Sequence, residues 1–218
     1  MLVGLAVAAA VVAGAVVAAR SGGPGGGASA TDATEPAPVE VTSDAPRFAT
    51  LAALVEAADA VVVGEVVAVE PGRWFGDDST GRLRSRLVTL AVDEVVAGSG
   101  PDDDAVLVEE EGWTADGAPL VVDGAAPSAV GDRGVWFLVD GGDPTTGAWI
   151  TVGAQGRYLL ARPGTGDAAS PGTSGAASPG TADAGDRALV GAAGDDPLVA
   201  ELAGETLETL VARIRAAA

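Results

Sequence analysis

The chain has 218 residues with a formal net charge of −19, and it contains no cysteine, histidine or lysine. This charge excludes the basic footprint that nucleic-acid binding requires, so no nucleic-acid partner is expected. The missing residue types exclude disulfides, thiolate nucleophiles, iron–sulfur clusters and a lipidated cysteine, and they remove the commonest general base and zinc ligand.

An uncharged apolar run leads the chain, and residues 1–20 are expected to form a single transmembrane or signal helix. The 18 residues from Leu2 to Ala19 would make a helix about 27 Å long, just short of a bilayer's hydrocarbon core. Two alternatives stay open. We favour a retained anchor with an extracytoplasmic domain; the other is a signal peptide cleaved near Ala30, which would give a secreted protein. Arg20 lies on the wrong flank for the anchor under the positive-inside rule.

A Gly-, Ala-, Thr- and Pro-rich segment follows, and residues 21–46 are predicted to be a disordered linker. The folded part is expected to begin at residue 47. Phe48, Leu51 and Leu54 have helical spacing, which predicts a short amphipathic helix ending near Asp59.

Two long strands are predicted next, at 60–70 and 83–96. Gly64 inside the first indicates a bulge or a tight bend. In the second, Arg84 and Arg86 are expected to project into solvent. The segment between the strands, residues 74–81, is predicted to be a polar loop. Shorter strands are predicted at 105–109, 120–122, 135–139, 148–152 and 157–161, with an irregular segment over 110–131.

Trp136 and Phe137 are neighbours in the strongly apolar strand at 135–139. Successive side chains of a strand point to opposite faces, so these two must face opposite sides of the sheet. We therefore expect both faces to be covered, one by the core and one by a helix from the C-terminus.

A duplicated Ala-Ala-Ser-Pro-Gly-Thr sequence lies in residues 163–186, which are predicted to be a disordered low-complexity insertion in the domain that spans 47–162. A tolerated insertion is favoured over a glycosylated or partner-binding loop. Residues 187–218 are predicted to form a short strand and a C-terminal helix that packs on the sheet. Gly204 is expected to interrupt this helix, with Thr206 as an N-cap.

No catalytic, cofactor-binding or metal-binding residue is assigned, and no cofactor is expected. Glu109 and Glu111 would lie about 7 Å apart on one side of a strand, a spacing compatible with a glycosidase-like acid and base, but such acidic runs are usually solvated. Residues 102–104 and the turn at 140–146 offer carboxylates to calcium without the EF-hand spacing, and aspartate is a common turn residue.

Three aromatic residues, Trp74, Phe75 and Trp113, fall in segments predicted to be loops. Beside carboxylates they could form a platform on which sugars stack. They could also plug the open ends of a small barrel, and this second interpretation is favoured.

The order of four segments, Asp59–Val66, Val92–Gly98, Val130–Leu138 and Gln155–Tyr158, resembles a group of uncharacterised exported bacterial (actinomycete-like) domains. More distantly it is similar to the OB-like barrels of netrin modules and tissue inhibitors of metalloproteinases. The resemblance implies a small OB-like β-barrel. This chain lacks the cysteines of the animal domains, so protease inhibition carries over to no residue here.

The sequence therefore predicts a mainly β fold, an OB-like barrel of five or six strands between a short N-terminal helix and a C-terminal helix. The expected function is that of a membrane-tethered or secreted envelope protein, a non-enzymatic binding module whose partner is an envelope protein or glycan. The alternatives are a carboxylate-dependent hydrolase of envelope polymers and a purely structural envelope protein. The sequence does not choose the ligand.

Overall fold

The computed structural model describes residues 36–77, 81–101, 104–141, 144–161, 189–191 and 196–218. The predicted membrane or signal helix and the predicted insertion at 163–186 lie outside these residues. Within them, no helix combines the length and the apolar character needed to cross a bilayer.

The described chain is mainly β, as predicted, and most of its strands belong to one antiparallel sheet. Two 16-residue strands form the centre of this sheet and pair along almost their whole length. A separate parallel pair joins β1 (Val39–Val41) to β5 (Leu120–Val122). The large sheet runs in the order β4 (Ala105–Thr114), β3 (Leu83–Gly98), β2 (Ala60–Phe75), β6 (Arg133–Val139), β8 (Arg157–Leu160) and β9 (Leu189–Gly191), and β7 (Ile150–Thr151) also pairs with β6.

The strands do not close into a barrel, so the closed barrel predicted from the sequence is wrong. The space between β4 and β6 is spanned at Trp149, the residue before β7. Its backbone oxygen accepts from the Glu109 N–H at 2.7 Å, and its N–H donates to the Leu107 oxygen at 2.8 Å. These two bonds make one isolated parallel bridge, because β7 is only two residues long and cannot form a continuous ladder with β4.

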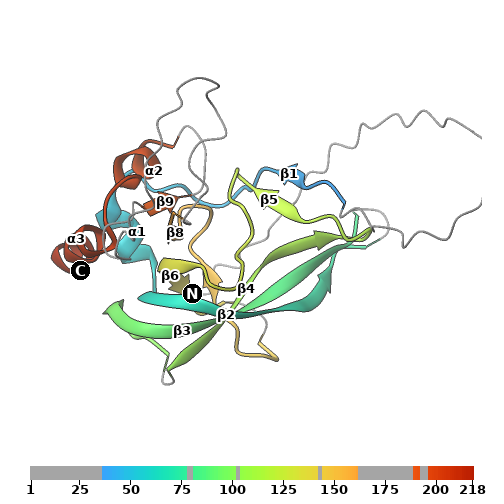
Figure 1. The fold of residues 1–218 in the computed structure, drawn as a ribbon, viewed down its shortest axis with the longest axis horizontal. Helices are drawn as coiled ribbons and strands as arrows, with labels where there is room; N and C mark the ends of the chain where they lie inside the picture. The colour runs from blue at the N-terminus through green and yellow to red at the C-terminus, as the bar shows by residue number, and fades with distance from the viewer. Residues whose placement is uncertain (1–35, 78–80, 102–103, 142–143, 162–188, 192–195) are drawn as a thin grey trace, which may run out of the picture.

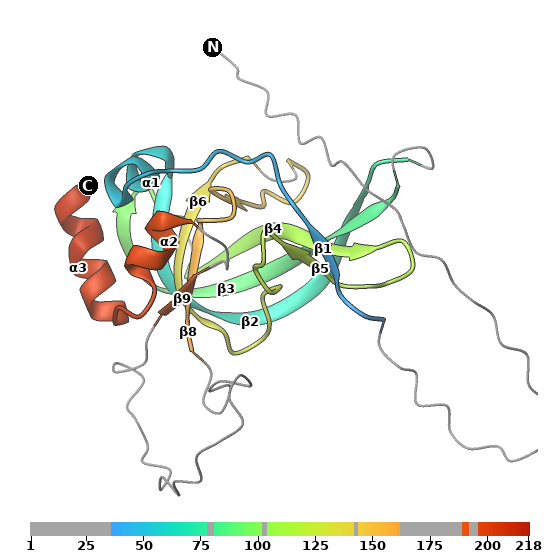
Figure 2. The ribbon, with the colours of Figure 1, turned by 90° about the horizontal axis from the view of Figure 1, so that it is seen from above.

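Helices gather at one end of the sheet, and the long strands β2 and β3 extend away from them toward β1 and β5 (Figures 1 and 2). The predicted N-terminal helix is α1 (Leu51–Ala57), capped by Thr50. The predicted C-terminal helix is two helices, α2 (Pro197–Leu202) and α3 (Leu207–Ala217).

The break between α2 and α3 lies where the sequence predicted it. Gly204 has a φ of +89°, a left-handed conformation that glycine adopts without the steric cost of a Cβ. Thr206 caps α3 by accepting a hydrogen bond from the Thr209 N–H at 3.2 Å. The leucines of the two helices still contribute to one buried cluster.

Both faces of the sheet are buried, as the neighbours Trp136 and Phe137 predicted. Trp136 belongs to a core between the curved strands β2, β3, β4 and β6. Phe137 belongs to a second core that α1, α2 and α3 cover, where its ring meets Tyr158 edge to face at a centroid distance of 6.1 Å. One sheet therefore separates two cores, and β2 and β6 each contribute buried side chains to both.

Three further differences from the sequence prediction concern where strands begin and end. Residues 39–41, expected in the disordered linker, form β1 because they pair in parallel with β5. No local sequence pattern predicts this distant partner. Trp74 and Phe75 belong to β2 rather than to a loop, since their pairing with β3 continues to the hairpin end. β4 likewise runs to Thr114, into the segment expected to be irregular. The bulge expected at Gly64 is confirmed by a register shift there.

Candidate functional site

A row of alternating arginine and tryptophan side chains crosses the outer end of β2, β3 and β4. Trp74 in β2 lies opposite Arg84 in β3, and Arg84 lies opposite Trp113 in β4. Residues paired in this way project from the same face of a sheet. The guanidinium carbons of Arg82 and Arg84 lie 5.1 and 5.5 Å from the Trp74 ring centroid, and that of Arg86 lies 4.5 Å from the Trp113 ring centroid. We call these five residues the Arg–Trp ladder.

The ladder is open to solvent at the hairpin end and closed at its inner end. Trp74 is 45% exposed and Arg82 is exposed, whereas Arg86 is only 5% exposed. Phe75, next to Trp74, is 40% exposed and has the guanidinium of Arg73 4.5 Å from its ring centroid. Large aromatic side chains are thus presented to solvent, each beside a cation.

Three of the ladder's members are set apart by their charge. Arg82, Arg84 and Arg86 form no ion pair with a carboxylate within the described part of the chain, although the sequence holds 31 acidic residues against 12 basic ones. Every other described arginine has such a partner. These paired arginines are Arg47, Arg73, Arg133, Arg157, Arg213 and Arg215. Among the described arginines, those without a carboxylate ion pair therefore all belong to the ladder, and of these Arg86 has the charge of Glu110 nearby.

A buried polar network holds the inner end of the ladder. Arg86 Nη1 donates to the Ser128 carbonyl oxygen at 2.8 Å, and Ser128 Oγ donates to Glu110 Oε1 at 2.7 Å. Arg157 Nη1 lies 3.0 Å from the same carboxylate oxygen. Arg86 Nε is buried and has no hydrogen-bond partner among the described atoms. Burial lowers the pKa of Arg86, the charge of Glu110 opposes that shift, and the charge of Arg157 adds to it.

The acidic residues singled out from the sequence do not form an acid–base pair at a cavity. Glu109 is buried and is held by Arg73, whose Nε and Nη2 each lie 2.9 Å from one of its oxygens. Glu111 as a whole residue is exposed, although burial around its carboxyl raises its pKa and the charge of Glu110 adds to that shift; Glu110 itself serves the buried network. The described parts of both aspartate-rich turns are likewise without a cluster of three or more possible metal ligands, and residues 102–103 and 142–143 lie outside the description.

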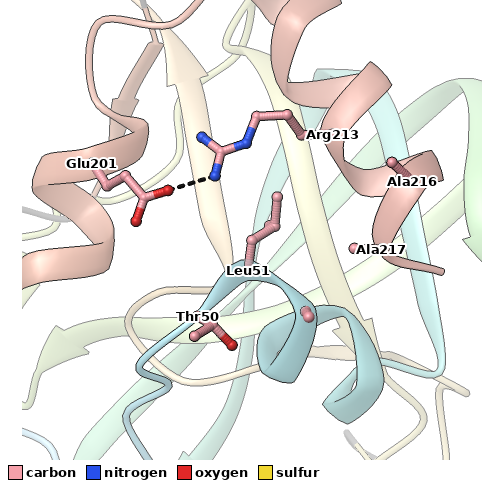
Figure 3. Close-up of a pocket in the computed structure, with 7 residues that line it drawn as sticks. Thr50, Leu51, Glu201, Arg213, Ala216 and Ala217 are labelled. Atoms are coloured by element: carbon pink, nitrogen blue, oxygen red, sulfur yellow. Dashed lines mark hydrogen bonds and ion pairs between the residues drawn. The ribbon is translucent and has the colours of Figure 1, made fainter.

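A shallow pocket lies between α1 and α3, away from the ladder (Figure 3). Its one basic residue, Arg213, contacts Glu201 at 2.5 Å and also pairs with Glu205. These hydrogen bonds raise the pKa of Arg213. The charged groups of this pocket thus pair with one another, and its apolar lining consists of Leu51 and three alanines.

Two expectations about individual residues are wrong. Trp74 and Phe75 do not plug a barrel end, because the hairpin carries them beyond the core; Trp113 is half-buried over Arg86. Arg86, expected in solvent, is buried. The sequence also held a signal for the ladder that the prediction missed: arginines at every second residue around the start of a strand, 82, 84 and 86, are expected on one face.

No protein-family model matches the chain, and a search of curated proteins gave no significant match. The resemblance to exported bacterial domains therefore stays a prediction, and the site is interpreted from its own geometry.

Proposed function

We propose that the protein is a non-enzymatic binding module of the cell envelope, membrane-tethered or secreted, and that it binds an anionic ligand through the Arg–Trp ladder. The observation that carries this proposal is that Arg82 and Arg84, at the open end of the ladder, have no carboxylate partner among the described residues of a strongly acidic chain. Guanidinium groups recognise carboxylates and phosphates through paired, charge-assisted hydrogen bonds. An anion from outside would complete the pairing that the chain leaves open.

The tryptophans prepare these arginines for binding. A guanidinium near the face of an indole is attracted by the ring, and this restricts a side chain that would otherwise lose much rotamer freedom on binding. Trp74 restrains Arg82 and Arg84 in this way, while Trp113 and the Ser128 carbonyl restrain Arg86. β3 pairs with β2 on one side and with β4 on the other, and this pairing supports the row from below.

The strand order supports a finer proposal about the fold. We propose an OB-like arrangement in which β2, β3, β4, the Trp149 segment and β6 follow one another around a core. In this arrangement β4 and the Trp149 segment are joined only by the parallel bridge between Val108 and Trp149. In OB-like folds, ligands bind on the second and third strands and the loop before them. The ladder occupies the corresponding β3, β4 and β2–β3 hairpin. This support is an analogy at the level of fold.

Cosedimentation of the full-length chain, purified in mild detergent, with isolated insoluble cell-envelope fragments tests this proposal. We expect the protein to sediment with the fragments and to be released as sodium chloride is raised, because salt screens exposed charges. The double variant Arg82→Gln/Arg84→Gln should stay largely in the supernatant.

The matched control is Arg133→Gln/Arg215→Gln, which removes the same charge from two exposed ion pairs, Arg133 with Asp93 and Arg215 with Glu94. This control should sediment like the wild type. Equal loss in both double variants, or no sedimentation of the wild type, would overturn the proposal. Release of soluble sugars from the fragments would point instead to a hydrolase.

A further inference from the structure

We infer that the ligand of the Arg–Trp ladder is an acidic polysaccharide, a chain of sugars that carry carboxylate groups. This inference rests on the proposed function and adds the chemical class of the ligand. It follows from three features of the ladder and its surroundings: two guanidiniums beside one exposed indole, a second exposed aromatic ring on the opposite side of the hairpin end, and acidic residues nearby.

The paired guanidiniums select the anion. Arg82 and Arg84 lie within 5.5 Å of the same ring centroid, that of Trp74, so their charges converge on one side chain at the hairpin end. A carboxylate carries one negative charge and two acceptor oxygens, which suits a pair of planar donors. On a chain of net charge −19, a single negative charge is also repelled less than a doubly charged phosphate ester.

The exposed rings select the sugar. Trp74 and Phe75 are adjacent residues of one strand and are 45% and 40% exposed, so they present an indole and a phenyl ring on opposite sides of the hairpin end. Pyranose rings carry C–H groups on their faces, and these pack on aromatic rings, whose faces carry negative charge. A sugar bearing a carboxylate would therefore contact a ring with its face and a guanidinium with its acid group.

The surroundings of the ladder exclude a densely charged polymer. Trp74 and Trp113 lie on either side of β3, two strand spacings or roughly 10 Å apart, so the basic row is short. Exposed acidic residues stand within four residues of ladder members along the chain: Glu70, Glu111 and Asp116. A nucleic acid, with a phosphate at every unit, would run from the arginines onto these carboxylates. Widely spaced charges on a sugar chain avoid them.

Titration calorimetry with the full-length chain tests the inference. The carboxylated sugar is an oligomer of polygalacturonate in which most units are methyl-esterified, so that the remaining free carboxylates are widely spaced. The matched ligand is the same oligomer with all its carboxylates methyl-esterified, which keeps the sugar rings and removes the charge. An oligodeoxythymidylate of similar length supplies the densely charged alternative. We expect polygalacturonate to bind at least about tenfold more tightly than either of the others.

Two variants locate the binding. Arg82→Gln/Arg84→Gln should weaken polygalacturonate binding by about tenfold or more, and Trp74→Leu, which keeps an apolar side chain, by about fivefold. Arg133→Gln/Arg215→Gln should bind like the wild type. Unchanged thermal unfolding of each variant shows that the fold is intact.

The inference falls if polygalacturonate does not bind, if the fully esterified oligomer or the oligodeoxythymidylate binds as well, or if the ladder variants bind like the wild type. Its failure is distinguishable from failure of the proposed function. Envelope fragments that still sediment the protein in a ladder-dependent way would keep the binding module and reject only the carboxylated sugar.

Discussion

Arg157 and Glu110 join two strands that are not hydrogen-bonded neighbours. Nη1 of Arg157, in β8, lies 3.0 and 3.2 Å from the two carboxylate oxygens of Glu110, in β4, and both side chains are mostly buried. The same carboxylate accepts from Ser128 Oγ, and Ser128 in turn accepts from Arg86 through its carbonyl oxygen. Glu110 is therefore the nearby anion for two buried arginines, Arg157 and Arg86.

Replacing Glu110 should strongly destabilise the fold. In Glu110→Ala, Arg157 and Arg86 remain buried without their nearby anion, and removal of one partner of a buried pair typically lowers the free energy of unfolding by about 3–5 kcal/mol. Urea unfolding measures the change. An exposed acid outside the network provides the control: Glu70→Ala should change stability by less than about 0.5 kcal/mol. Equal effects of the two variants would show that the network contributes little.

Gly134 is required by the close approach of β8 to β6. A Cβ at this position would meet the Tyr158 carbonyl oxygen and lie 2.9 Å from the Leu159 Cα, both parts of a backbone that cannot turn aside. We expect Gly134→Ala to lower the free energy of unfolding by about 1–3 kcal/mol, as overpacking does. Gly141→Ala is the control, because its Cβ would make only ordinary contacts with Ile150. A stable Gly134→Ala protein would contradict this packing.

Gln155 ties the chain before α1 to the start of α2. Its Oε1 accepts from the Phe48 N–H at 2.6 Å, and its Nε2 donates to the Phe48 oxygen and to Asp196 Oδ1, both at 2.9 Å. Gln155→Glu keeps the size and the acceptor but replaces the donor with a charge that faces Asp196. We expect this variant to lose about 1–3 kcal/mol of stability, measured by urea unfolding. Stability equal to the wild type would show that the donor is dispensable.

Tyr158 predicts a loss of stability at alkaline pH. Burial raises the pKa of its hydroxyl above the ordinary value, and the charges of Asp196 and Glu201 raise it further. The folded protein therefore keeps this proton after the unfolded chain has lost it at about pH 10. Above that pH the unfolded state binds fewer protons, so the free energy of unfolding should fall by about 1.4 kcal/mol per pH unit.

The test uses the fact that Tyr158 is the chain's one tyrosine. Tyrosinate absorbance should rise only at a pH well above 10 in the folded protein, and at about 10 in urea. In Tyr158→Phe the alkaline loss of stability should shrink. Near neutral pH this variant should be at least as stable as the wild type, because the hydroxyl is buried with no hydrogen-bond partner among the described atoms. An ordinary tyrosinate titration in the folded state would contradict the burial.

Much of the fold was predictable because its central elements carry local signals. The β-branched run from Ala60 and the alternating run from Leu83 predicted the two longest strands, and Thr206 after Gly204 predicted where α3 begins. Strand ends were less predictable, since pairing with a neighbour extends β2 through Trp74 and Phe75. β1 depends on β5, a partner about 80 residues away, and so no local pattern could reveal it.

The candidate site was only half predictable. Its exposed aromatics were noted from the sequence, but their role depends on register, which brings Trp74 and Trp113 to the two sides of Arg84. The burial of Arg86 depends on Ser128, from a distant loop. That three ladder arginines form no ion pair among the described residues is a property of the fold, since the sequence offers acids in excess.

The adjacency of Trp136 and Phe137 also bears on how the molecule comes apart. The two residues are consecutive in β6, and each side chain is fully shielded from water on its own side of the strand. Separating the helices from the sheet would expose Phe137 to water and loosen β6, which also carries Trp136. Unfolding of the helix-covered core should therefore destabilise the second core as well. Heat should accordingly produce one sharp calorimetric peak for this body, with no half-melted species accumulating along the way.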